Sequence, residues 1–99
     1  MALQRYAFIF KAPGMDFLTR NGRMESEDFA ATLGGVADIE QAVLVAQELL
    51  TRHVQLIELC GAFSAEEVEQ IRGALGERIP VGSVQYSAAE RERLQQAFA

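Results

Sequence analysis

The sequence has few residues that would hold a small protein together covalently or around a metal ion. It contains one cysteine, one histidine and no tryptophan among its 99 residues. A single cysteine cannot form an internal disulfide, so nothing in the sequence requires an oxidising compartment. One histidine and one cysteine do not make a zinc ligand set, and no carboxylates have EF-hand spacing. We therefore expect neither a metal nor a cofactor.

Phosphate-binding motifs and long apolar runs are also missing. Neither G-x-G-x-x-G nor G-x-x-x-x-G-K-[ST] occurs, and the serine hydrolase motif G-x-S-x-G is absent. No apolar run approaches membrane-spanning length, and residues 7–10 are too few for the apolar core of a signal peptide. We expect a soluble cytoplasmic protein that binds no membrane.

Positive charge is scarce and unevenly distributed. The net charge of −5 argues against nucleic acid and anionic membrane surfaces as partners. Residues 1–24 carry +3, whereas the rest of the chain carries −8. Acidic surface helices that follow a strand with basic flanks would explain this asymmetry, and a basic loop that meets an anionic ligand is the alternative.

The length of the chain predicts a single domain, residues 1–99, with a thin core. Strand patterns cover residues 5–12, 29–36, 54–61 and 81–86, and helical patterns cover 38–53, 64–79 and 88–98. Each helix begins with a capping pair, namely Asp38 with Gln41, Ser64 with Glu67, and Ser87 with Glu90. Residues 15–28 have turn residues and no apolar stripe, so we expect a long loop there.

Short strands alternating with helices predict an α/β fold with a small, mainly parallel four-stranded sheet. The element order is β-β-α-β-α-β-α. Numbered along the chain, the strands are expected in the flavodoxin-like order 2-1-3-4; a two-layer α+β sandwich with an antiparallel edge is the alternative. Right-handed crossovers place the first two helices on one face and leave the other to residues 88–98. Because that helix has few apolar residues and 49% of the chain is apolar, we expect a homodimer or higher oligomer.

Two residues of the third strand are candidates for catalysis. Glu58 interrupts an apolar strand and therefore needs a partner or a raised pKa; Lys11, Arg20 and Arg23 are candidate partners. A structural ion pair is the plainer interpretation of Glu58. Cys60 precedes a helix N-terminus, which favours a thiolate nucleophile, but the acids in the first turn of that helix oppose one, and a buried inert cysteine is the alternative.

Residues 8–14, 54–63 and 79–82 are three segments that together span most of the chain. In their order and approximate spacing they resemble a family of small bacterial α/β proteins of unknown function. The family resemblance implies no activity and no catalytic residue. It draws attention to strand ends that meet at one edge of the sheet.

Ligands of open α/β sheets bind beyond the carboxyl ends of the strands, where the strand order reverses. The predicted crevice lies between the first and third strands. Its walls are expected to be Lys11, Pro13, Gly14, Glu58, Cys60 and Gly61. Gly34, Gly35 and Tyr86 would close the crevice, and the loop would supply Arg20 and Arg23. Three functions fit this crevice. The first is an oligomeric binding or accessory protein for a small polar metabolite, with an anionic metabolite as a candidate partner. The second is an isomerase or lyase using Glu58 as acid or base, and the third is an assembly subunit with no small-molecule site.

Overall fold

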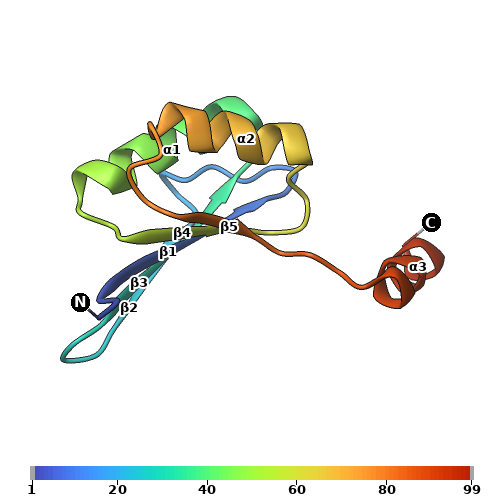
Figure 1. Cartoon of the computed structure of the whole chain (residues 1–99), viewed down its shortest axis with the longest axis horizontal. Helices are drawn as coiled ribbons and strands as arrows, with labels where there is room; N and C mark the ends of the chain where they lie inside the picture. Colours follow the sequence, from blue (N-terminus) through green and yellow to red (C-terminus); the bar gives the residue numbers. More distant parts are fainter. Residues whose placement is uncertain (1, 99) are drawn as a thin grey trace.

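The computed structural model describes residues 2–98, which form five strands and three helices. In chain order these are β1 (Arg5–Lys11), β2 (Asn21–Glu25), β3 (Ala30–Val36), α1 (Ile39–Thr51), β4 (Leu56–Leu59), α2 (Ala65–Ala74), β5 (Val81–Ser83) and α3 (Ala88–Ala97). The strands build one sheet in the order β2-β3-β1-β4-β5 (Figure 1).

The sheet is mixed rather than purely parallel. Strands β3, β1, β4 and β5 run parallel, and their order agrees with the predicted 2-1-3-4. The prediction of only four strands was wrong, because β2 adds an antiparallel edge to β3. The segment predicted as a loop thus contains a strand, which begins after a helical turn at residues 16–20. All five residues of β2 are exposed, so the strand has no buried face that an apolar pattern would reveal.

Helices α1 and α2 pack side by side on one face of the sheet, as predicted (Figure 1). Alternate strand residues such as Ile9, Ile57 and Leu59 point into this layer and are fully buried. They meet a helical stripe that includes Leu49 and Ile71. No polar or charged side chain within residues 2–98 is fully buried, so this core is held by apolar contact alone.

The expected helix starts are all present. The Asp38 carboxylate accepts a hydrogen bond from the backbone N–H of Gln41 at 2.9 Å, and Ser64 and Glu67 form a complete capping box. Helix α2 ends at Ala74, earlier than the predicted residue 79, because the chain turns at Gly76 with a left-handed φ of 62°. Within the described part of the chain, no helix combines the length and the apolar character needed to cross a bilayer.

Helix α3 does not cover the second face of the sheet, and that prediction was wrong. Strand β5 ends at Ser83, and residues 84–87 carry the chain away from the sheet in an irregular, exposed path (Figure 1). No residue of α3 is buried. Its apolar stripe, Leu94, Ala97 and Phe98, is too short to hold a ten-residue helix against the body. We call residues 84–98 the C-terminal arm.

The second face of the sheet is therefore uncovered. The strand alternation places on it the side chains that point away from α1 and α2. We call this surface the open face; it carries Tyr6, Phe8 and Phe10 of β1, Met24 of β2, Leu33 of β3, and Leu56 and Glu58 of β4.

Candidate functional site

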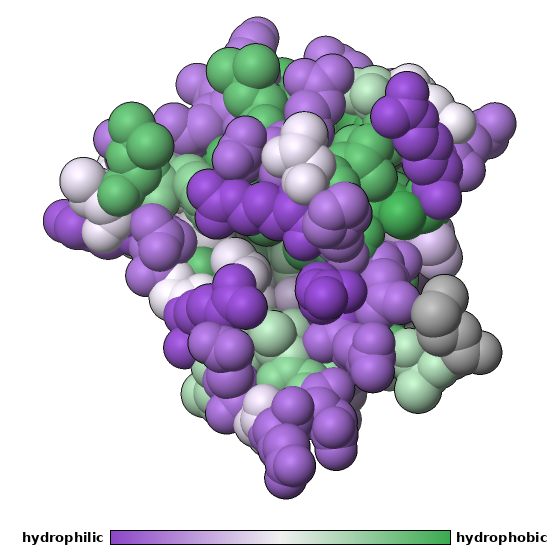
Figure 2. Space-filling model, turned by 90° about the vertical axis from the view of Figure 1, so that its left-hand side faces the viewer, coloured by the Kyte–Doolittle hydropathy of each residue, from purple (hydrophilic) through white to green (hydrophobic). Residues whose placement is uncertain are grey.

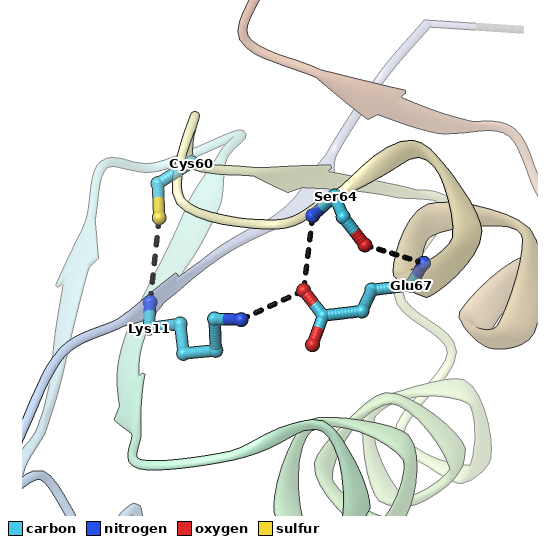
Figure 3. Close-up of polar contacts among 4 residues, drawn as sticks. All are labelled: Lys11, Cys60, Ser64 and Glu67. Atoms are coloured by element: carbon cyan, nitrogen blue, oxygen red, sulfur yellow. Dashed lines mark hydrogen bonds and ion pairs between the residues drawn. The ribbon is translucent and has the colours of Figure 1, made fainter.

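The predicted crevice between β1 and β4 is occupied by a network of the chain's own side chains (Figure 3). The Lys11 ammonium forms an ion pair of 2.7 Å with the Glu67 carboxylate, which also accepts a hydrogen bond from the Ser64 backbone N–H at 2.9 Å. The same ammonium lies 5.4 Å from the centre of the Phe63 ring, within the range of a cation–π contact. Lys11 is thus bound on two sides at the point where a ligand was expected.

The network stabilises the charged form of Glu67. The hydrogen bond from Lys11 and then that from the Ser64 backbone hold the pKa of the Glu67 carboxyl below its usual range. A carboxylate in the first turn of α2 also suits the positive end of the helix dipole. The charges of the crevice therefore neutralise one another, and an incoming anion would have to displace Glu67.

Cys60 lies beside this network and packs against the core. Its Sγ accepts a hydrogen bond from the backbone N–H of Lys11 at 3.3 Å, and the residue packs against the core at intermediate exposure. Helix α2 begins five residues later, at Ala65, with Glu66 and Glu67 in its first turn. These contacts match those of a structural thiol, and they offer no base that would deprotonate it.

Glu58 has a different partner from the three that the sequence suggested. The Tyr6 hydroxyl donates a hydrogen bond of 2.5 Å to Glu58 Oε1 on the open face. Arg23 instead pairs with Glu25 on β2, and Lys11 pairs with Glu67. Strand β2 lies three places from β4 in the sheet, which keeps Arg23 away from Glu58. The partner is a neutral phenol, so Glu58 is not half of an ion pair.

This environment raises the pKa of the Tyr6 hydroxyl. Partial burial, followed by the hydrogen bond and the negative charge of Glu58, raises the pKa of Tyr6 to about 12. The Tyr6 ring also stacks on Phe29 with 6.3 Å between ring centres. The phenol therefore stays protonated near neutral pH and keeps the Glu58 carboxylate hydrogen-bonded.

The glycines predicted to approach a ligand approach side chains instead. A Cβ on Gly34 would overlap the Phe17 ring, and one on Gly35 would lie 2.8 Å from the Phe10 ring. Pro13 and Gly14 form the exposed turn after β1, where Gly14 has a φ of 76°. The Gly34-Gly35 pair therefore admits aromatic rings against β3.

Arg20 lies at the rim of a shallow, mainly apolar hollow on the open face, and its guanidinium bonds the neighbouring Thr19 carbonyl. The hollow lies beside β1 and β3 and includes Phe10, Met15 and Leu33. Arg20 and Arg23 are both exposed, and neither reaches the network around Lys11. The basic segment therefore does not form one anion site with the crevice.

A larger cleft lies at the far edge of the sheet, between α2 and the C-terminal arm. It has a volume of about 580 Å³. Two predicted ligand residues meet there, because the Tyr86 ring lies against Gly61 at a distance that leaves no room for a Cβ. We call it the edge cleft; its lining also includes Phe63, Val68, Val84 and Leu94 as apolar residues and Glu69, Arg72, Ser83, Gln85 and Arg91 as polar ones.

The polar groups of the edge cleft come from three elements. Arg72 of α2 donates to the Val81 carbonyl at 3.0 Å and pairs with Glu69. Arg91 of α3 donates to the Tyr86 carbonyl at 3.0 Å and, within residues 2–98, forms no ion pair. Two guanidinium groups and one carboxylate leave the cleft with a local positive charge on an acidic protein.

Of the residues that line the edge cleft, the sequence analysis named Gly61 and Tyr86 as ligand candidates and did not name Arg72 or Arg91. Arg72 and Arg91 occur on helices at ordinary surface positions, where a lone arginine carries no signal. Only the tertiary structure, which places the arm opposite one side of α2, brings them to one cleft. Among residues 2–98 no group of three or more His, Cys, Asp or Glu side chains is placed to hold a metal ion.

Comparison with known proteins gives one match. The model of a family described as "Family of unknown function (DUF6506)" matches residues 4–99. No curated protein and no solved structure matches the chain.

Proposed function

We propose that this chain, which belongs to the family of unknown function DUF6506, is a small oligomeric protein that binds a polar metabolite in the edge cleft. The metabolite carries a carboxylate beside an apolar group. The main support for this proposal is the cleft itself, which joins two arginines to an apolar wall at the carboxyl edge of the sheet. Ligands of open α/β sheets commonly bind at that edge.

The size of the edge cleft supports a small molecule as the occupant. Its volume of about 580 Å³ lies within the range of roughly 300–1,000 Å³ that is typical of small-molecule sites. Such sites combine an apolar lining with a few polar groups that fix the orientation of the ligand. Here Phe63, Val68 and Leu94 supply the apolar lining.

The charges of the cleft support a carboxylate. A guanidinium binds a carboxylate through two parallel hydrogen bonds, and Arg91 uses one donor on a neutral carbonyl. The Ser83 hydroxyl and the Gln85 amide, which bond each other at 2.9 Å, lie nearby as further hydrogen-bonding groups. The arm supplies both Tyr86 and Arg91, so it forms one wall of the site.

Titration with benzoate, followed by amide resonances of the full chain, tests this proposal. Benzamide is the control ligand because it has the same shape without the charge. We expect benzoate at millimolar concentration to shift the amides of Gly61, Ser83 and Tyr86, and benzamide to shift them much less. Equal responses to both ligands, or no response to benzoate, would reject a carboxylate site.

A pair of variants on α3 assigns the charge. Arg91→Gln removes one of the two guanidinium groups of the cleft. It should weaken benzoate binding by about tenfold, as expected for one charge-assisted contact. Arg93→Gln is the matched control, since Arg93 lies on the same helix, pairs with Glu90 and does not line the cleft. Equal losses from both variants would point to a general charge effect.

A second candidate function uses Glu58. The hydrogen bond from Tyr6 places a carboxylate and a phenol together on the open face, and such a pair suits an isomerase or lyase that moves a proton. Neither Glu58 nor Cys60 lines the edge cleft, so this activity would need its own substrate position on the open face. Glu58→Gln separates the two functions, because it should abolish proton transfer and leave benzoate binding unchanged.

A further inference from the structure

The open face has the composition of an interface rather than of a solvated surface. Seven side chains on it include three aromatic rings, two leucines and a methionine. A sheet face in contact with water normally carries polar side chains at these positions. Interface cores, by contrast, are enriched in aromatic residues and methionine and depleted of charge. Figure 2 shows a different side of the molecule, where hydrophilic side chains separate the hydrophobic ones into several groups.

Among the open-face side chains of the described strands, the single carboxylate is that of Glu58, and it is already hydrogen-bonded. Glu58 accepts from the Tyr6 hydroxyl, so covering the face would not leave either group without a partner. The open-face side chains of the described strands include no lysine or arginine that a partner would have to match. Two identical copies of the face can therefore meet without an extended field of like charge.

The helix of the C-terminal arm, α3, is also without a packed apolar side. Helix α3 has ten residues and buries none of them, while isolated helices shorter than about 12 residues are marginal in water. Phe98, which caps it, is 82% exposed. The arm carries two glutamates and two arginines, so it adds no net charge to a surface that it covers. The stability of helix α3 is easier to explain if another chain packs against that helix.

We infer that two copies of this chain form a two-fold dimer through their open faces, and that each arm packs Phe98 against the partner. This inference deepens the oligomeric part of the proposed function. The same chain supplies an uncovered sheet face and an unpacked helix, and a two-fold axis makes every contact between the two copies twice, once from each chain. The edge cleft keeps its own arm as a wall and lies beside the seam.

Estimates of area explain why the arm is needed. At the usual strand spacing and rise, the five strands give a flat footprint of roughly 400 Å² for each copy. Two such faces bury roughly 800 Å², which is below the range of about 1,200–2,000 Å² for stable complexes. A ten-residue helix is about 15 Å long and 10 Å wide, so two arms with both contacting surfaces add roughly 600 Å². The sum then falls within the range.

Sedimentation velocity of the full chain between about 1 and 100 µM tests the dimer at concentrations where specific interfaces of this size associate. We expect a species of twice the chain mass of 10.9 kDa. Leu33→Glu, which places a charge in the open face at a residue 48% exposed, should shift the protein to monomer. Leu44→Glu is the control, since Leu44 is 67% exposed on α1, on the opposite side of the sheet.

A second pair of variants tests the arm. Phe98→Ser should weaken the dimer by about tenfold or more, as for a well-packed apolar anchor. Leu18→Ser, at a residue 85% exposed in the helical turn at residues 16–20, should leave it unchanged. Circular dichroism checks the fold of each variant. If Leu33→Glu does not fold, Met24→Glu replaces it, because Met24 lies on the edge strand and is exposed.

The outcomes separate this inference from the metabolite site. A wild-type monomer at 100 µM, the top of the range expected for specific association, would overturn the dimer even if benzoate still shifts Gly61 and Tyr86. A dimer that withstands both Leu33→Glu and Met24→Glu would overturn the open-face seam, and one that is indifferent to Phe98→Ser would overturn the packing of the arm. A dimer that is lost with Leu33→Glu and fails to bind benzoate would support the interface and reject the metabolite function alone.

Discussion

The two faces of the sheet are built from the same strands and yet have different surroundings. On the covered face Ile9, Ile57 and Leu59 are fully buried beneath α1 and α2. On the open face their neighbours Phe8 and Glu58 remain partly exposed. The strand patterns are apolar on both sides, so the difference comes from the helices: two crossover connections cover one side, and the arm leaves the other bare.

This comparison separates residues that fold the chain from residues available for other contacts. Apolar side chains on the covered face stabilise the single chain by leaving water. Apolar side chains on the open face contribute fully to stability only if another surface covers them. Four measurements test the comparison, and they are given from the largest expected effect to the smallest.

Neighbouring residues on β4 give the largest contrast. Ile57→Ala should lower the free energy of unfolding by about 2–5 kcal/mol, because it leaves a cavity in the covered layer. Leu56→Ala removes a half-buried side chain on the open face and should lower it by about 1 kcal/mol in dilute protein. Urea unfolding at submicromolar concentration measures both. Equal losses would mean that the two faces are equally packed within one chain.

Glycine positions give the next contrast. Gly34→Ala should destabilise by about 1–3 kcal/mol, because its Cβ would overlap the Phe17 ring on the covered face. Gly35→Ala should be milder, since the flexible end of Met15 is among the atoms it meets on the open face. Gly73→Ala, with open space around it in α2, should stabilise by about 0.5–1 kcal/mol. Thermal unfolding measures whether each variant is stabilised or destabilised. A destabilised Gly73→Ala variant would contradict the open space around Gly73.

The ion pair beside the covered core predicts an acid-dependent loss of stability. Because the folded state lowers the pKa of Glu67, its contribution is present above the unfolded pKa and is lost as pH falls through the folded value. Glu67→Gln should therefore lower the stability by about 1 kcal/mol at pH 7 and reduce the fall below roughly pH 4 to 5. Urea midpoints from pH 7 to 3 measure this. Parallel acid profiles in the two proteins would show that the ion pair contributes nothing.

The hydrogen bond on the open face predicts the smallest effect, at the alkaline end. Because the pKa of Tyr6 is raised to about 12, its contribution is present below the ordinary value of 10 and is lost as pH rises towards 12. Tyr6→Phe should remove this alkaline loss of stability. Near pH 7 it should lower the free energy of unfolding by about 1 kcal/mol, because one hydrogen bond is lost.

The absorbance of phenolate should show the same residue directly. Tyr6→Phe should delete the part of the titration near pH 12. Glu58→Gln should move that part to lower pH, because the amide keeps a hydrogen-bond acceptor but loses the charge. An alkaline titration that is identical in all three proteins would mean that Tyr6 and Glu58 do not interact in solution.

Local patterns in the sequence correctly predicted most elements. The capping pairs at Asp38, Ser64 and Ser87 located all three helix starts, because a cap depends on residues only three positions apart. The order of the four parallel strands also followed, since βαβ connections are right-handed and short. Strand β2 was missed because all its residues are exposed, and its only support is the ladder to β3.

The sequence by itself determined the α/β class and the placement of two helices on one face of the sheet, because hydrophobic period and capping are properties of neighbouring residues. It also determined that both sides of the strands would be apolar. Only the tertiary structure decided which groups meet. It joined Glu58 to Tyr6, a residue 52 positions away, through strand register, and it joined Lys11 to Glu67 across the crevice. It also carried α3 away from the sheet, because the burial available to three apolar residues does not hold a helix in place.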